Sequence, residues 1–451
     1  MIEKIIEEIK NKKICILGFG IEGKSTYNFI RKHLKNIPIE IRYIKENGEE
    51  KSFLEKDNNL KFIINENYLE GLEEYDLIFK SPGISLKDID TKGIEEKLIS
   101  QYDLFLKNTD NYTIGITGTK GKSTTSSLIH KVLEEQNKKT YLLGNIGTPI
   151  FDLIDTIEKD AIVVLEISSH TLEFAKHSTN IAILLNIFEE HLDHYKNFEG
   201  YALAKINLVK NKKDVAIFNL DNENINNLYD NYSNEDFGIT INNNKKTNQT
   251  ISLNDNKIYY NDKFLYDANQ DRNLKGKHNL NNIMFVLAVS KILNLDIQKT
   301  ISTINSFNPL EHRLEYVGKF DGVEYYNDSI ATIPEATIES INALEKVNTL
   351  IVGGNDRGVD QTELIKFLIS SEVENIICLP KTGEYIQEGL KETDKNVKLV
   401  NTIEEAVTTA KEVTKKETIC VLSPAASSYG YFKNFKERGN KFKELVSNWN
   451  L

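Results

Sequence analysis

The stretch Tyr112-Thr-Ile-Gly-Ile-Thr-Gly-Thr-Lys-Gly-Lys-Ser-Thr-Thr-Ser-Ser127 decides the architecture of this chain. An apolar run typical of a β-strand leads into a glycine-rich turn, and Gly121-Lys122-Ser123 then opens a helical pattern. Such a turn exposes backbone N–H groups beside the positive end of the helix dipole, which favours binding of a polyphosphate. We predict that Lys122 contacts phosphate oxygens and that Ser123 binds magnesium.

This turn differs from the general motif G-x-x-x-x-G-K-[ST] at one position. Ile116 stands where the motif has its first glycine, so Gly118 must supply the turn. A glycine-rich loop with a chance lysine is the structural alternative. Because the loop follows an apolar β-type run, nucleotide phosphate binding is the stronger interpretation.

Length and composition describe a soluble, enzyme-like protein. A chain of 451 residues exceeds one ordinary core and predicts three domains. No apolar run approaches the roughly 18 residues that span a bilayer, and the N-terminal ten residues form a Glu-rich amphipathic pattern unlike a signal peptide. The three scattered cysteines, Cys15, Cys378 and Cys420, indicate buried thiols in a reducing compartment. We expect a cytoplasmic location.

The net charge of −11 argues against a broad nucleic-acid surface and favours small anionic ligands in local basic pockets. We therefore expect small-molecule substrates, no nucleic-acid partner, no membrane span and a monomeric chain.

Two glycine loops mark a first α/β domain. Gly18-Phe19-Gly20 follows the apolar run Ile14–Leu17, and Ser81-Pro82-Gly83 follows a second apolar run. Both loops are expected at the carboxyl edge of one parallel sheet, where a nucleotide diphosphate binds. A dinucleotide site is an alternative, since Glu40 or Glu46 could supply the acidic residue that such a site needs.

Three ionisable residues follow apolar runs of the central region. Glu166 comes directly after Ala161–Leu165 and can bind magnesium at the sheet edge, although a solvated strand-end carboxylate is the alternative. His191 lies beyond Ile181–Asn186, and its residue type alone leaves a surface histidine equally open. Lys205 lies in a helical segment with apolar neighbours, where a lysine commonly extends its amine to solvent.

The order of these motifs resembles the Mur ligase superfamily over nearly the whole chain. The resemblance rests on Thr117–Thr124, on the helix start Gly276-Lys-His-Asn279-Leu-Asn-Asn282, on Glu311-His-Arg313, and on Asn327-Asp328-Ser329. The Asn-rich helix start has a structural alternative, because asparagine also caps helices. The run from Tyr431 to Gly439 points to the branch that adds glutamate.

The resemblance implies three ligand sites and a metal centre. It implies an ATP site formed by Gly118, Thr119, Lys120, Gly121, Lys122, Ser123, Thr124, Asn279, Asn282, Arg313 and Asp328. It implies a UDP-substrate site formed by Gly18, Phe19, Gly20, Ser81, Pro82, Gly83, Asn145 and Ser168. It implies two magnesium ions held by Ser123, Glu166, His191 and Lys205, the last carbamylated by CO2, and a catalytic set of Lys122, Glu166, His191 and Lys205.

The implied glutamate pocket departs from the family pattern at two positions. Thr332, Arg357, Ser428 and Phe435 are implied to form it. Ile330 stands where the D-glutamate ligases carry a lysine, and Arg357 stands where they carry a second lysine. A rarer branch that adds L-glutamate has a similar pattern, so the isomer stays open.

The expected fold is α/β with three domains: a UDP-substrate-binding Rossmann-like domain over 1–107, a central P-loop ATPase-type parallel sheet over 108–309, and an amino-acid-binding Rossmann-like domain over 310–451.

The activity that the resemblance implies is ATP-dependent ligation of glutamate to UDP-N-acetylmuramoyl-L-alanine through an acyl phosphate, in peptidoglycan precursor synthesis. A ligase for another peptide or for a folate, and a nucleotide-driven switch without ligase activity, are the alternatives.

Overall fold

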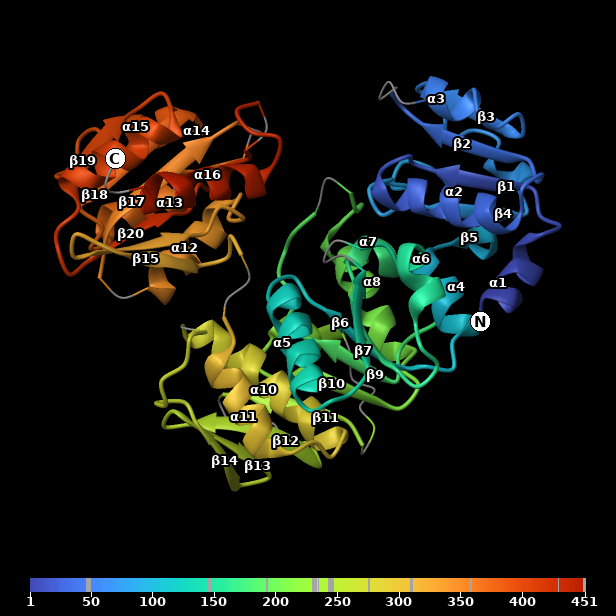
Figure 1. Cartoon of the computed structure of the whole chain (residues 1–451), viewed down its shortest axis with the longest axis horizontal. Coiled ribbons are helices and arrows are strands. Elements are labelled where there is room, and N and C mark those ends of the chain that lie inside the picture. The colour runs from blue at the N-terminus through green and yellow to red at the C-terminus, as the bar shows by residue number, and fades with distance from the viewer. Residues whose placement is uncertain are drawn as a thin grey trace. The chain divides into compact units, whose positions relative to one another are not determined.

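The computed structural model describes residues 1–45, 50–144, 148–191, 194–228, 233, 235–241, 247–274, 276–308, 311–344, 346–356, 359–428 and 430–448, without the side chains of 277, 278 and 335. These residues form three separate sheets, each covered by helices (Figure 1). They contain no helix with the length and apolar character needed to cross a membrane.

The first sheet is parallel and carries both glycine loops of the first domain. Its strand order is β3-β2-β1-β4-β5. The strands are β1 (Ile14–Leu17), β2 (Ile39–Tyr43), β3 (Leu60–Ile64), β4 (Leu77–Lys80) and β5 (Leu98–Ile99). The helices are α1 (Ile2–Ile9), α2 (Ile21–His33), α3 (Glu50–Leu54) and α4 (Gln101–Asn108), with 3-10 turns η1 (Leu72–Glu74) and η2 (Glu95–Lys97).

The central sheet combines a parallel part with antiparallel hairpins. Its order is β14-β13-β12-β11-β10-β9-β6-β8-β7, and β12, β13 and β14 pair antiparallel. The strands are β6 (Tyr112–Thr117), β7 (Thr140–Gly144), β8 (Ile162–Glu166), β9 (Ile181–Leu184), β10 (Val215–Asn219), β11 (Phe237–Thr240), β12 (Gln249–Asn254), β13 (Lys257–Tyr260) and β14 (Lys263–Asp267). The helices are α5 (Lys122–Glu135), α6 (Ile150–Leu153), η3 (Ile154–Thr156), α7 (Ser169–Leu172), α8 (Phe198–Lys210), α9 (Glu223–Leu228), α10 (Lys277–Ile292) and α11 (Ile297–Ser306).

The third sheet is parallel except for its edge strand β15. Its order is β15-β16-β20-β17-β18-β19. The strands are β15 (Glu315–Phe320), β16 (Val323–Asn327), β17 (Val347–Gly354), β18 (Asn375–Lys381), β19 (Asn396–Leu399) and β20 (Ile419–Leu422). The helices are α12 (Pro334–Ala343), α13 (Thr362–Ser370), α14 (Thr382–Gly389), α15 (Ile403–Val413) and α16 (Phe435–Ser447).

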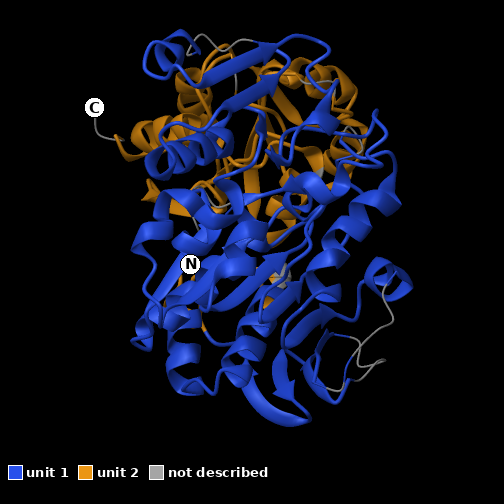
Figure 2. Ribbon diagram, turned by 90° about the vertical axis from the view of Figure 1, so that its right-hand side faces the viewer, with its two compact units in different colours: residues 1–270, 281–304 blue, residues 271–280, 305–451 orange. Residues whose placement is uncertain are grey.

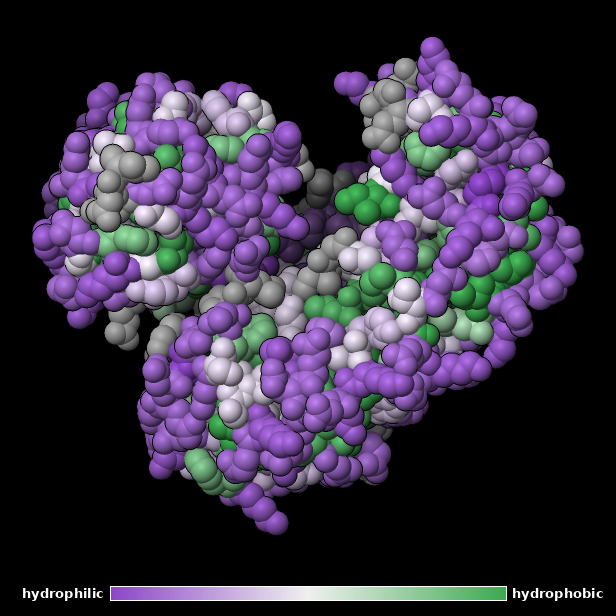
Figure 3. Space-filling view, viewed as in Figure 1, coloured by the Kyte–Doolittle hydropathy of each residue, from purple (hydrophilic) through white to green (hydrophobic). Residues whose placement is uncertain are grey.

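The predicted α/β fold with three sheet-containing domains is confirmed. The central strands are buried on both faces, which is why β6, β8 and β9 read as continuous apolar runs in the sequence. The three cysteines are free and buried, as expected. The chain divides into two compact units: residues 1–270 with 281–304, and residues 271–280 with 305–451 (Figure 2). Hydrophilic side chains cover most of the face of each unit drawn in Figure 3.

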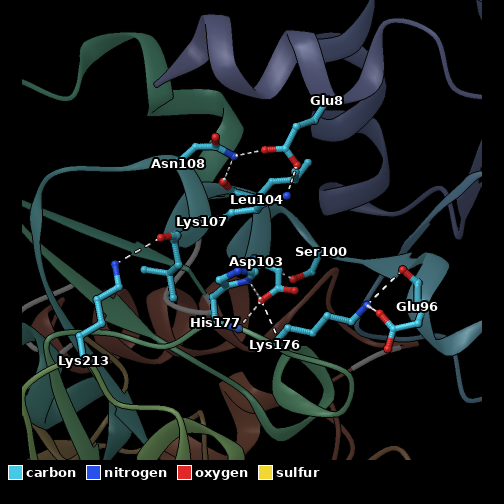
Figure 4. A network of polar contacts seen from close by, with 11 residues as sticks. Glu8, Glu96, Ser100, Asp103, Leu104, Lys107, Asn108, Lys176, His177 and Lys213 are labelled. Carbon is cyan, nitrogen blue, oxygen red and sulfur yellow. Dashed lines mark hydrogen bonds and ion pairs between the residues drawn. The ribbon is translucent and has the colours of Figure 1, made fainter.

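Helix α4 joins the first sheet to the central sheet inside the first unit. The buried Asp103 carboxylate accepts hydrogen bonds from the backbone N–H groups of Lys176 and His177, at 3.0 and 2.9 Å (Figure 4). The Gln101 side chain donates to Thr26 Oγ1 at 2.9 Å and accepts from the Phe151 N–H at 3.0 Å. Phe29 stacks on Phe151 with ring centroids 4.2 Å apart. These contacts join α4 to α2, to α6 and to the segment after α7 within this unit.

Candidate active site

The predicted phosphate-binding loop, residues 118–121, lies between β6 and α5 as predicted and is called the phosphate-type loop below. Gly121 adopts a left-handed φ of +88° immediately before α5, a conformation that glycine tolerates and other residues rarely adopt. The backbone N–H of Lys120 donates to Asn186 Oδ1 at 2.9 Å, and that of Thr119 donates to the Asn186 carbonyl at 3.0 Å. The end of β9 therefore fixes the shape of the loop.

Two lysines converge on one carbonyl of this loop. Lys122 Nζ donates to the carbonyl oxygen of Gly118 at 2.8 Å, and Lys205 Nζ donates to the same oxygen at 2.9 Å. Lys205 is only 2% exposed and lies over the ring of Tyr201, whose hydroxyl is 2.8 Å from Thr119 Oγ1. The alternative offered by the sequence, that the Lys205 amine extends to solvent, is therefore wrong.

The environment of Lys205 favours the neutral form of its amine. Burial, and then the positive charge of Lys122, lower the pKa of Lys205 well below its ordinary value. A neutral lysine amine is a nucleophile, whereas an ammonium is not, so this position suits reaction with CO2.

We expect Gly121→Ala to weaken ATP binding, with KM for ATP rising by at least about 10-fold. The added methyl group would combine a strained φ with a close contact, since a Cβ there would lie 2.6 Å from Asn282 Oδ1. Gly93→Ala is the matched control, because Gly93 has the same φ of +88° but no neighbouring atom within 4 Å of the added Cβ. Steady-state kinetics over a range of ATP concentrations would test this, and an unchanged KM in Gly121→Ala would contradict it.

Glu166 and His191 belong to strand ends on either side of β6: Glu166 is the last residue of β8, and His191 lies in the segment that follows β9. Glu166 ends β8, is 2% exposed and pairs in register with Ile116 of β6 and Gly144 of β7. His191 has a left-handed φ of +60°, and its side chain is 42% exposed. Its ring lies 4.7 Å from the ring of His170, measured between centroids. Burial, together with the nearby His194 and His191, lowers the pKa of His170 to about 3.

The donors predicted for magnesium are a hydroxyl, a carboxylate, an imidazole and a lysine. The described part of the chain contains no group of three or more His, Cys, Asp or Glu side chains arranged for a metal ion. Magnesium prefers oxygen ligands. The buried Glu166 carboxylate suits it directly, while Lys205 suits it only as a carbamate.

The two glycine loops of the first domain lie side by side, as predicted. The N–H of Ser81 donates to the Leu17 carbonyl at 2.9 Å, and a Cβ on Gly18 would lie 3.0 Å from Ser81 Cβ. Gly20 is the N-cap of α2. The ring of Phe19 instead packs in an aromatic cluster and is buried, so the side chain belongs to the core.

A cavity of about 180 Å³ connects these loops to the central sheet. Pro82 lines one side of it, and Glu166 with Gly144 lines the other. Ser168, a predicted substrate contact, caps the short helix α7 and accepts from the Thr171 N–H. Asn145, also predicted here, lies outside the described residues.

Sequence reasoning missed most of the residues that line this cavity, among them Glu22, Gln101 and Thr171. Glu22 lies inside the G-x-G-x-x-G turn, so the motif itself offered a signal. Gln101 and Thr171 carried no signal, because their positions depend on how the first domain packs on the central one. The alternative of a dinucleotide site needs an acidic residue at the end of the second strand. Glu40 does not supply it, because it lies within β2 and forms an ion pair with Arg42 at 2.7 Å. Glu46 lies outside the described residues.

We expect Glu22→Gln to raise the melting temperature at pH 8 by a few degrees and to leave it nearly unchanged at pH 5. Burial raises the pKa of Glu22 to about 7, and Lys80 offsets only part of that shift. Because the unfolded carboxyl ionises near pH 4.3, the folded state loses stability as pH rises toward 7, and glutamine removes that loss. Thermal unfolding at both pH values tests this, with the exposed Glu55→Gln as control. A gain only at pH 5 would contradict it.

In the second unit, Asp328 and Arg313 lie at the carboxyl edge of the third sheet. The Asp328 carboxylate is 3% exposed and accepts from Ser423 Oγ at 3.0 Å and from the Leu314 N–H at 3.1 Å. Burial raises the pKa of Asp328 to about 6. Asp328 therefore holds the turn that carries Arg313.

The predicted glutamate residues lie on three segments of the third domain. Thr332 precedes α12, Ser428 follows β20, and Phe435 begins α16. The Phe435 carbonyl accepts from Ser329 Oγ at 2.8 Å, which ties two of these segments together. Arg357 lies outside the described residues.

The remaining ATP-site predictions, Asn279 and Asn282, are both buried in α10. Thr125 Oγ1 donates to Asn282 Oδ1 at 3.2 Å, so Asn282 supports the helix that follows the phosphate-type loop. The binding roles of all these residues stay predictions.

Comparison with known proteins agrees with this geometry. The Mur ligase middle domain matches residues 116–290, and the Mur ligase glutamate ligase domain matches residues 312–426. The chain is 35% identical to the UDP-N-acetylmuramoylalanine–D-glutamate ligase of Clostridium acetobutylicum, over 99% of this chain and 98% of that protein. It is 32% identical to the ligase of the same name from Clostridioides difficile, over 98% and 99%.

Solved structures of the same fold cover nearly the whole chain. UDP-N-acetylmuramate-alanine ligase MurC from Thermotoga maritima superposes with a TM-score of 0.59 at 19% identity, covering 97% of this chain and 99% of that one. MurF ligase from Thermotoga maritima in complex with ADP gives a TM-score of 0.57 at 16% identity, covering 98% and 96%.

The chain therefore belongs to the Mur ligase family, whose members are ATP-dependent, amide-bond-forming ligases. Its full-length likeness is to the glutamate-adding ligases of that family.

Proposed function

We propose that this chain joins D-glutamate to UDP-N-acetylmuramoyl-L-alanine with consumption of ATP, in cytoplasmic peptidoglycan precursor synthesis. One observation carries the proposal: a cavity runs from Glu22 and Pro82, beside the two glycine loops of the first domain, to Glu166, which lies in the same sheet as the phosphate-type loop. The relatives named for this reaction support it over their full length.

The chemistry requires the substrate carboxylate to become a leaving group. A carboxylate oxygen attacks the γ-phosphorus of ATP, ADP leaves, and an acyl phosphate forms. The glutamate amine then attacks the acyl carbon, the tetrahedral intermediate expels inorganic phosphate, and the amine loses a proton. Carboxylate and γ-phosphate repel each other, so a fixed cation at their meeting point lowers the barrier.

The ammonium of Lys122 supplies that cation. Magnesium ions held by Ser123, Glu166, His191 and carbamylated Lys205 would neutralise further phosphate charge. The buried Tyr201 and Thr119 fix the position of Lys205 and exclude water around it.

Phosphate release with ATP, Mg²⁺ and UDP-N-acetylmuramoyl-L-alanine tests the proposal, with the isomer of glutamate as the only variable. Release with D-glutamate supports it. The L-isomer is the second candidate, because Ile330 and Arg357 depart from the pattern of the D-glutamate ligases. Release only with L-glutamate would establish that activity. Release that needs no amino acid would indicate a nucleotide-driven switch.

A further inference from the structure

Arg438 is a buried cation in the third domain that pairs with no acid among the described residues. It lies on α16 and is only 1% exposed. Its guanidinium donates to Ser329 Oγ at 3.0 Å, to the Ser329 carbonyl at 2.8 Å and to the Ala426 carbonyl at 3.1 Å. Every one of these acceptors is neutral.

A buried charge without a counter-charge is costly, so its retention needs an explanation. Burial alone lowers the pKa of Arg438, to about 9, and no neighbouring carboxylate acts against that shift. The guanidinium remains protonated at neutral pH. The interior of this domain therefore holds a positive charge that its own described residues leave uncompensated.

This charge lies beneath the three segments assigned to glutamate. Ser329 is three residues before Thr332, and Ala426 is two residues before Ser428. Phe435 begins the helix that carries Arg438, and its carbonyl accepts from Ser329 Oγ. The last residue of β17 also approaches closely, since a Cβ on Gly354 would lie 3.1 Å from Arg438 Nη1. These segments end or follow strands at the carboxyl edge of the sheet, where ligands of open α/β sheets bind.

We propose that Arg438 is a positioning residue that selects a dicarboxylic amino acid: its buried charge attracts the side-chain carboxylate of the substrate, and its three hydrogen bonds hold the segments that contact that substrate. The proposal rests on the proposed function, because it assumes that glutamate is the amino acid used. The substrate supplies the missing counter-charge, so the cost of burying the cation is offset only in the complex.

The charge of Arg438 can be separated from its structural role by comparing glutamate with glutamine of the same handedness. The probes differ by one charge. The Arg438→Gln variant keeps hydrogen-bond donors but loses the charge, and we expect its kcat/KM for glutamate to fall roughly 50-fold with little change for glutamine. KM for ATP and for the UDP substrate should stay within about 3-fold of the unmodified chain. The Arg438→Lys variant should retain most of the preference for glutamate near pH 7 and lose it as pH rises, because a buried lysine deprotonates more readily than arginine.

The control is Lys441→Met, which removes a half-buried cation of the same helix that pairs with Glu404. An equal loss for glutamate and glutamine in Arg438→Gln, or a pH-independent preference in Arg438→Lys, would show a structural role only and overturn the proposal. If Arg438→Gln does not fold, the pH dependence of Arg438→Lys decides the question. Absence of phosphate release with glutamate in the unmodified chain would refute the proposed function instead, so the two failures are distinguishable.

Discussion

Replacing Lys205 with alanine is expected to reduce glutamate-dependent phosphate release by roughly 10³-fold or more. The variant removes the buried amine that lies 2.9 Å from the Gly118 carbonyl and whose pKa is lowered, and with it the carbamate we propose as a magnesium ligand. It also opens a space beside Tyr201 that a small carboxylic acid can enter. Acetate or propionate should therefore restore part of the activity.

Two measurements separate this expectation from simple loss of structure. The exposed Lys210→Ala at the end of the same helix should behave like the unmodified chain. The rescued rate should rise with carboxylate concentration and reach a plateau. Full activity of Lys205→Ala without added acid would remove the carbamate from the mechanism.

The second large effect is expected at Lys122. In Lys122→Met the side-chain volume stays similar while the charge at the mouth of the phosphate-type loop is lost. Its amine donates to the Gly118 and Thr119 carbonyls, which places the charge at the turn itself. Because this cation opposes the repulsion between carboxylate and γ-phosphate, kcat should fall by about 10³-fold.

Loss of Lys122 has a second consequence that identifies its electrostatic role. Its charge helps to lower the pKa of Lys205, so the Lys205 pKa should rise in Lys122→Met. Lys131→Met is the control, because Lys131 is exposed on the same helix and pairs with Glu135. Unchanged phosphate release in Lys122→Met would contradict the assignment.

The sequence predicted those parts of the site that depend on local pattern. A strand, a glycine turn and a helix start lie next to each other in the chain, so the loop around Lys122 could be located from its residues alone. Glu166 could be placed because the carboxyl ends of parallel strands share one edge.

Other features depend on contacts between segments far apart in the chain. Phe19 belongs to a glycine motif, yet tertiary packing turns its ring into the core. Gln101 becomes a cavity wall only because α4 packs against α2 and α6. Arg438 stands in a run of charged residues that resembles an exposed helix face, and nothing in that run reveals that its guanidinium is buried.

The apolar core of the first unit is continuous from Ile5 to Ile225 and includes side chains of both the first and the central sheet. The third sheet has separate apolar clusters on its two faces. Cooperative unfolding follows the extent of a shared core. The first two domains should therefore melt as one block and the third as another, so that a UDP ligand shifts one calorimetric transition and leaves the other in place. The gain expected for Glu22→Gln should then appear in the transition of the first block.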